Sequence, residues 1–155
     1  MIAGLRILPD DLTSEPVLAL LQCHLDEMHK WSPACKVHAM PAERLRQNDV
    51  SFFSAWDGDR LAGCGAIKHL DSAHGELKSM RSAPDYRGRG VGKAILLHLL
   101  AVARERGYSR VSLETGRPEA FGDAQNLYRA FGFTECSPFG DYVSDEFSMC
   151  MTREI

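Results

Sequence analysis

Apolar residues recur at helical spacing in three stretches of the chain, which predicts three long helices. The first stretch follows Thr13, a candidate helix cap, and has Pro16 in its first turn. Its apolar face consists of Val17, Leu18, Leu21, Leu25 and Met28. The longest stretch runs from Val91 to Arg106 and ends at Gly107. The remaining predicted helices cover residues 118–131 and a short segment at 41–45.

Between these stretches lie shorter segments that are typical of strands. The predicted strands cover residues 5–8, 50–56, 61–70, 76–81, 111–114, 133–136 and 147–152. Because a helix separates strands 76–81 and 111–114, these two are expected to be parallel, in an otherwise antiparallel sheet. The pattern therefore predicts an α/β (α+β) fold with a mixed, mostly antiparallel central sheet, a parallel pair at its centre and flanking helices.

Composition narrows the class of protein. A chain of 155 residues with 45% hydrophobic and 25% charged residues is expected to form a single domain over residues 1–155. Its net charge of −3 gives no bulk electrostatic case for nucleic acid or an anionic membrane. No apolar run approaches the roughly 20 residues of a membrane span. The five scattered cysteines and the absence of a signal-peptide pattern predict reduced thiols and a cytoplasmic location.

A glycine-rich segment before the 91–106 helix is a candidate anion site. Residues 84–93 read Pro-Asp-Tyr-Arg-Gly-Arg-Gly-Val-Gly-Lys. Glycines admit unusual backbone angles, and successive N–H groups at a helix start attract anions, so a pyrophosphate is the expected ligand. The segment is not a P-loop, because Ala94 stands where Ser or Thr is required. Its G-x-G-x-G spacing also differs from the dinucleotide-binding G-x-G-x-x-G.

Two motifs carry a family resemblance. Residues 87–92 fit R/Q-x-x-G-x-G/A, and residues 127–133 fit L-Y-x-x-x-G-F. Together with the helix between them, they resemble the GCN5-related N-acetyltransferase (GNAT) superfamily, in its small bacterial-type single-domain form. The resemblance covers residues 76–135 in the expected order. It implies the acyl-CoA N-acyltransferase fold, acetyl-CoA as cosubstrate, and direct transfer of the acetyl group to an amine.

The resemblance also implies which residues bind the coenzyme. The pyrophosphate would lie on the glycine loop, at Arg87, Gly88, Arg89, Gly90, Val91, Gly92 and Lys93. The preceding strand would hydrogen-bond the pantetheine arm through its backbone and end in a bulge at Met80, Arg81 and Ser82. Family members often place an Asn near the start of the next helix. Here Phe121 stands at that offset, which leaves the nearby Asn126 as the candidate contact.

Three side chains are candidates for proton transfer. The resemblance places Tyr128 near the thioester sulfur, where a phenol can protonate the departing thiolate; the alternative is an aromatic core residue.

An amine acceptor arrives mostly as ammonium, with a pKa of about 10.4, so a carboxylate is needed to take a proton. Glu114 is the preferred base and Glu76 the second candidate. The alternatives are a solvent-facing Glu76 paired with Lys78 and a Glu114 hydrogen-bonded to a loop.

The sequence says less about the pocket that binds the amine acceptor than about the coenzyme site. The segment from His29 to Met40 is expected to shape the acceptor pocket, with Trp31 and His38 as candidate substrate contacts. The histidines have no metal-ligand spacing, so no metal is expected. Cys64 is a candidate nucleophile only if it is exposed with a lowered pKa.

The expected function is therefore an N-acetyltransferase that acts on acetyl-CoA and an amine, with a small molecule as the expected acceptor. One alternative is a non-catalytic acyl-CoA sensor of the same fold, and another is a protein N-terminal or lysine acetyltransferase. Neither nucleic acid nor a membrane is an expected partner. Free sheet edges make a homodimer possible.

Overall fold

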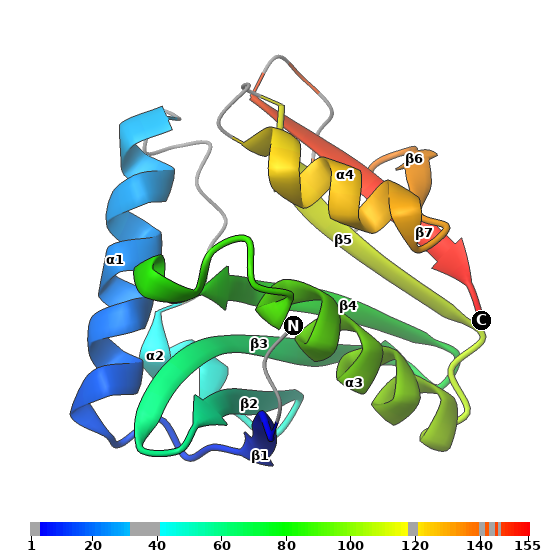
Figure 1. The fold of residues 1–155 in the computed structure, drawn as a ribbon. Coiled ribbons are helices and arrows are strands. Elements are labelled where there is room, and N and C mark those ends of the chain that lie inside the picture. The colour runs from blue at the N-terminus through cyan, green and yellow to red at the C-terminus, as the bar shows by residue number, and fades with distance from the viewer. Residues whose placement is uncertain (1–3, 32–40, 118–120, 140–141, 143–144, 146) are drawn as a thin grey trace.

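A computed structural model describes residues 4–31, 41–117, 121–139, 142, 145 and 147–155 (Figure 1). The helices are α1 (Glu15–Trp31), α2 (Ala42–Leu45), α3 (Val91–Glu105) and α4 (Gly122–Ala130). The strands are β1 (Arg6–Pro9), β2 (Val50–Asp57), β3 (Arg60–Asp71), β4 (His74–Ser82), β5 (Arg110–Gly116), β6 (Thr134–Cys136) and β7 (Ser148–Glu154). One 3₁₀ turn, Pro84–Tyr86, precedes α3. The order of helices and strands is the predicted one.

The described strands form one seven-stranded sheet in the order β1-β2-β3-β4-β5-β7-β6. All neighbouring strands run antiparallel except β4 and β5, which are parallel. The predicted fold class is therefore confirmed. A helix between β4 and β5 forces the parallel pairing, because the chain must cross over the sheet before it can re-enter in the same direction.

Two hydrophobic clusters pack on opposite faces of this sheet. On one face, Ile67 and Leu77 pack with Leu96 and Leu99 of α3. On the other face, Cys64 and Ala66 of β3 pack with residues of α1 and α2. The alternation of side chains along β3 sends neighbouring residues to opposite faces, so the two clusters share one strand.

The start and the buried face of α1 differ from the sequence prediction. Val17 and Leu21 are buried as predicted, but Leu18, also expected on the buried face, is 37% exposed, and Leu20 is buried in its place. Thr13 is not the cap, because its hydroxyl donates to Asp11 Oδ1 at 2.6 Å. At the other end of the fold, α4 begins at Gly122 rather than at the predicted residue 118, and residues 118–120 lie outside the described part.

The central parallel pair separates halfway along its length. β4 and β5 pair from His74–Arg110 to Leu77–Leu113, after which each strand continues alongside its other neighbour only. β4 also has a bulge opposite Gly65, and Ser79 in that bulge has a left-handed φ of 54°. The two strands therefore diverge on the side of the molecule where α3 begins (Figure 1).

Gly63 allows β3 to lie close to the end of β4. A Cβ at this position would lie 2.7 Å from the Arg81 carbonyl oxygen and 2.8 Å from Val91 Cγ1. Because the carbonyl belongs to the sheet backbone, we expect Gly63→Ala to lower the free energy of unfolding by about 1–3 kcal/mol. Gly122→Ala is the matched control, since a Cβ there has nothing within 4 Å. Chemical denaturation of both variants measures the difference, and equal stabilities would contradict the prediction.

Candidate active site

The diverging strands border a cleft of about 120 Å³. Its walls come from α1, β4, β5, α4 and the segment before β7. The lining residues include His24, Met28, Glu76, Lys78, Ser79, Met80, Glu114, Gly116, Phe121, Tyr128, Tyr142 and Phe147. The cleft thus brings together residues from near the start of the chain, such as His24, and from near its end, such as Ser148.

All three proton-transfer candidates line this cleft. Tyr128, on α4, is 7% exposed, and burial alone raises the pKa of its hydroxyl far above the usual range. Its ring stands edge-on to Phe133 at 5.8 Å, so part of the side chain also belongs to the core. Glu114 of β5 and Glu76 of β4 line the cleft from the two diverging strands. The geometry is one in which an acid and a base can act on the same small molecule.

Glu76 is held by two donors. Tyr142 donates its hydroxyl proton to Glu76 Oε2 at 2.5 Å, and Lys78 Nζ lies 3.2 Å from the same oxygen. Lys78 also donates to the Tyr142 hydroxyl at 2.6 Å. The pairing of Glu76 with Lys78 was anticipated, but its solvent-facing placement was wrong, since Glu76 is 2% exposed. Burial and the Glu76 charge raise the pKa of Tyr142.

Tyr142 was not singled out as a site residue from the sequence. It reaches Glu76 across 66 positions, and a contact between a strand and a distant loop leaves no periodic signal in the chain. The consequence for the site is that the Glu76 charge is already compensated by Lys78 and Tyr142.

The glycine loop has the backbone of an anion site. Gly88 and Gly90 have φ values of 74° and 84°, a region that only glycine adopts without strain. The first hydrogen bond into α3 runs from the Ala94 amide to the Gly90 carbonyl, so the amides of residues 91–93 are the ones that a helix start leaves without an intrahelical acceptor. The Arg87 and Arg89 amides already donate to the Pro84 and Tyr86 carbonyls, at 3.5 and 3.3 Å. Val91 is 1% exposed in the core, so its contribution to a bound anion can only come from the main chain.

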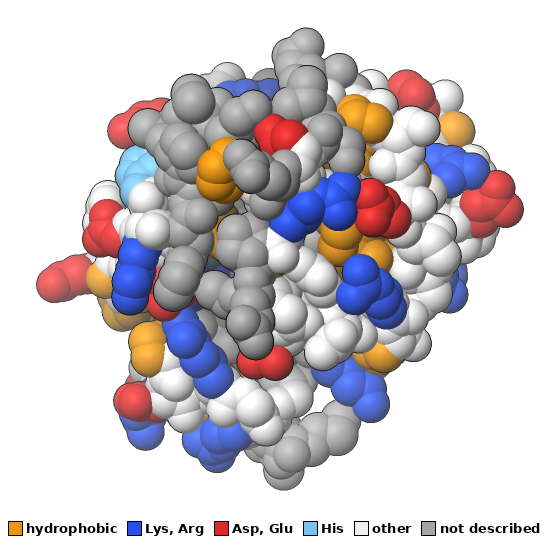
Figure 2. Space-filling model, turned by 90° about the horizontal axis from the view of Figure 1, so that it is seen from above, with side chains coloured by type: hydrophobic (Ala, Val, Ile, Leu, Met, Phe, Trp, Pro, Cys, Tyr) orange, Lys and Arg blue, Asp and Glu red, His pale blue; other side chains and the backbone are white. Residues whose placement is uncertain are grey.

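The other residues predicted to bind the pyrophosphate differ in their exposure to solvent. Lys93 is exposed, and Gly92 lies against α4, where a Cβ would be 3.3 Å from Leu127 Cδ2. The Arg89 guanidinium stacks over the Tyr86 ring at 4.8 Å. On the face seen from above, basic and acidic side chains are interspersed among the coloured residues (Figure 2). An anion site here is therefore local to the loop rather than part of a broad basic face.

Glu27 of α1 joins the end of β4 to the glycine loop. Its carboxylate lies 2.5 Å from Arg81 and 3.1 Å from Arg87. These two guanidiniums, Arg81 first, lower the pKa of Glu27 to about 2. The Arg81 side chain is 10% exposed, whereas that of Arg87 is 54% exposed. The bulge predicted near Met80, Arg81 and Ser82 lies at Ser79 and Met80.

Phe121, not an asparagine, occupies the start of α4. Its ring lies so close to Gly116 that a Cβ there would be 2.3 Å from Phe121 Cδ2. Asn126 is exposed on α4 and is not among the residues that line the cleft. The Trp31 side chain and His38, the candidate acceptor contacts, lie outside the described residues.

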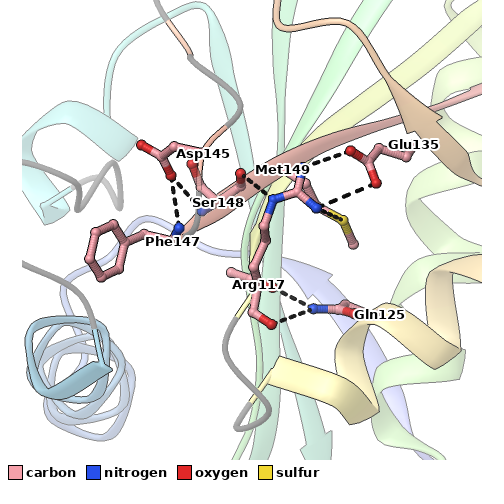
Figure 3. Close-up of polar contacts among 8 residues, drawn as sticks. Arg117, Gln125, Glu135, Asp145, Phe147, Ser148 and Met149 are labelled. Atoms are coloured by element: carbon pink, nitrogen blue, oxygen red, sulfur yellow. Dashed lines mark hydrogen bonds and ion pairs between the residues drawn. The ribbon is translucent and has the colours of Figure 1, made fainter.

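A polar network holds together the wall of the cleft that is formed by the end of β5, the start of β7 and α4 (Figure 3). Arg117 donates from Nε to the Ser148 carbonyl at 3.1 Å and pairs with Glu135 at 2.6 Å. Gln125 Nε2 donates to the Gly116 carbonyl at 2.6 Å. These bonds tie the end of β5 to β7, β6 and α4, so the wall is set by groups that the sequence did not mark as functional.

The described residues give less support to a cysteine nucleophile, a metal site or a membrane-spanning helix. Cys64 is fully buried, and burial raises the pKa of its thiol to about 12, so it stays protonated at neutral pH. The described side chains contain no cluster of three metal-ligating groups. Among the described helices, none has the length and apolar character needed to cross a bilayer.

A mixed sheet that splays at its central parallel pair, with a glycine loop at the start of the crossover helix, defines an acyltransferase of the acyl-CoA N-acyltransferase fold. The family model of the acetyltransferase (GNAT) family matches residues 13–133. The uncharacterized N-acetyltransferase YsnE of Bacillus subtilis is 47% identical over 146 residues, which cover 94% of this chain and 97% of that protein. The chain belongs to the GNAT family of acetyltransferases, and it is an enzyme of the acyltransferase class.

Solved structures share the whole fold. A Klebsiella pneumoniae protein assigned to the acyl-CoA N-acyltransferases has a TM-score of 0.78 and 26% identity, with 98% of both chains covered. A GNAT acetyltransferase from Elizabethkingia anophelis, solved with acetyl-CoA bound, has a TM-score of 0.70 and 14% identity, with 99% of both chains covered. At that identity the second likeness concerns the fold alone.

Proposed function

We propose that this protein transfers the acetyl group of acetyl-CoA to the amine of a small molecule by direct attack. The observation that carries the proposal is the cleft between β4 and β5, which Glu114 and Tyr128 both line. The cleft volume of about 120 Å³ favours a small acceptor over a folded protein surface.

The end of the cleft next to the glycine loop offers hydrogen-bond donors and acceptors that can bind coenzyme A. Left-handed glycines at positions 88 and 90 and the amides that open α3 offer donors to a pyrophosphate. The β4 edge beyond Leu77 has no strand partner on the β5 side, so its main chain can hydrogen-bond an amide-containing arm. The bound coenzyme would supply an acetyl thioester, and the arm would lead from the loop toward Tyr128.

The protein side of the reaction needs three proton transfers. Glu114 would accept a proton from the acceptor ammonium, which frees the amine lone pair for attack on the thioester carbonyl. As the carbon–sulfur bond breaks, Tyr128 would donate its hydroxyl proton to the departing sulfur, and the second proton that the nitrogen loses on becoming an amide would return to the Tyr128 oxygen. Burial favours the neutral phenol, so Tyr128 holds the proton it must give across the neutral pH range. Asn126, Met80, Arg81 and Ser82 remain proposed coenzyme contacts.

Donor binding and turnover test this proposal separately. We expect acetyl-CoA to bind in calorimetry, and free thiol to appear when a small amine is added. Gly90→Val should weaken acetyl-CoA binding about tenfold or more, because a β-branched residue resists the φ of 84° that shapes the loop. Gly107→Val is the matched control: its φ is 80°, but it lies beyond the opposite end of α3.

The alternatives give different results. Binding of acetyl-CoA without thiol release across a panel of small amines would favour an acyl-CoA sensor. Thiol release with peptides alone would favour a protein acetyltransferase. A protein that binds no acetyl-CoA, or that loses binding equally in the Gly90 and Gly107 variants, would contradict the proposed use of the loop.

A further inference from the structure

Two buried polar atoms in the cleft, one on His24 and one on Ser79, have no hydrogen-bond partner among the described residues. His24 and Ser79 are each 9% exposed, and both line the cleft. No described group hydrogen-bonds His24 Nδ1 or Ser79 Oγ. Buried polar atoms are normally paired, because an unpaired one loses its hydration without compensation. Two unpaired polar atoms inside a substrate cleft indicate that a bound ligand supplies their hydrogen-bond partners.

His24 enters the cleft from the side opposite Tyr128. It lies three and four positions after Leu21 and Leu20, which pack on the α1 face of the sheet. Tyr128 belongs to the cluster on the α3 face. The proposed donor arm leads to Tyr128, so a group that contacts His24 belongs to the acceptor.

The chemistry of this subsite is uncharged. Burial, reinforced by the Arg81 charge, lowers the pKa of His24 to about 4, so the imidazole is neutral and offers one donor and one acceptor. The Ser79 hydroxyl can also donate or accept. Among the described cleft side chains, Glu76 and Glu114 outnumber Lys78, which already pairs with Glu76. A carboxylate on the acceptor would meet no spare cation among them.

We propose that His24 and Ser79 bind an uncharged hydrogen-bonding group, a hydroxyl or a primary amide, on the acceptor and thereby select which amines are acetylated. The selected acceptor carries this group a short distance from its amine, with the amine directed to Glu114. The inference rests on the proposed acetyl transfer and adds a substrate class to it.

Matched amines test the subsite. The probes are 2-aminoethanol against propylamine, which has a methyl group in place of the hydroxyl, and glycinamide against glycine. Wild-type protein should show a KM about tenfold lower for 2-aminoethanol than for propylamine, the size expected for one satisfied buried hydrogen bond. Glycinamide should be preferred over glycine. A preference for glycine would show that the group recognised is a carboxylate and would overturn the proposal.

Variants connect the preference to the two residues. His24→Phe keeps a ring without nitrogen atoms, and Ser79→Gly removes the hydroxyl while tolerating the left-handed φ. Each should bring the two KM values together, and His24→Phe, which changes a residue of α1 and not of the strand proposed to bind the coenzyme, should leave the KM for acetyl-CoA unchanged. His98→Phe is the control: its Nε2 is also buried and unpaired among the described residues, but His98 lies on α3 outside the cleft lining. It should keep the wild-type preference.

A binding readout separates recognition from catalysis. In protein saturated with CoA, which cannot turn over, the ¹⁵N resonances of the His24 imidazole should shift with 2-aminoethanol and not with propylamine. If the protein releases thiol with both amines at equal KM and the resonances stay unchanged, the His24–Ser79 assignment alone fails. If acetyl-CoA does not bind, the proposed transfer fails and this assignment fails with it.

Discussion

Replacing Glu114 by glutamine should lower kcat by about two to four orders of magnitude, the usual contribution of a general base. Glutamine keeps the size of the side chain but cannot accept a proton from the ammonium. In the wild type, kcat/KM should fall toward acid pH as the base becomes protonated, and this acid limb should be absent from the variant. A pH–rate profile with saturating acetyl-CoA measures both effects.

Two controls accompany this variant. Glu43→Gln changes an exposed carboxylate on α2 and should have no effect on kcat. Glu76→Gln should mainly reduce stability, because it leaves the buried Lys78 ammonium without its counter-ion, a change that typically costs about 3–5 kcal/mol. Full activity in Glu114→Gln would rule out Glu114 as the base, and loss of the acid limb in Glu76→Gln would assign the role to Glu76.

Tyr128→Phe should lower kcat about 100-fold and leave acetyl-CoA affinity unchanged. The substitution keeps the ring that packs on Phe133 and removes only the hydroxyl that would protonate the thiolate. Burial raises the Tyr128 pKa above its ordinary value of about 10, so ionisation of this group should not reduce wild-type kcat below that pH. Steady-state kinetics from pH 6 to about 10 test both statements.

Tyr108→Phe provides the comparison. Tyr108 is another buried tyrosine, 5% exposed, whose hydroxyl bonds His69 at 2.6 Å outside the cleft lining. Its loss should change stability and not kcat. An acyl donor with a more acidic thiol should be less affected by Tyr128→Phe, because its thiolate needs less help to leave. Equal losses with both donors would argue that Tyr128 only shapes the cleft.

The parts of the fold that follow from local pattern were predictable. Hydrophobic periodicity and the crossover rule gave the order of helices and strands and the parallel β4–β5 pair, and the glycine spacing located the loop before α3. Two details of α1 were predicted wrongly. Thr13 bonds Asp11 and α1 begins at Glu15. Its contact with the sheet buries Leu20 and leaves Leu18 37% exposed, because which of two nearby leucines faces the sheet depends on tertiary packing.

The contacts within the cleft could not be predicted in the same way. The Tyr142 hydroxyl bonds both Lys78 and Glu76, which lie 64 and 66 positions earlier in the chain. In the sequence, His24 is only one of six histidines without metal-ligand spacing. Its unpaired nitrogen becomes evident only when the opposite wall of the cleft is in place. Tertiary proximity of this kind has no periodicity along the chain.

The Glu27 carboxylate gives α1 two attachments of unequal strength. The side chain of Arg87 is 54% exposed, whereas that of Arg81 is 10% exposed, so water and salt weaken the Arg87 pair more than the Arg81 pair. A phosphate that binds Arg87 would break the Glu27–Arg87 ion pair and leave the Glu27–Arg81 pair intact. The arrival of a donor therefore need not move the helix that carries His24, and the acceptor side can stay pre-formed while the loop adjusts.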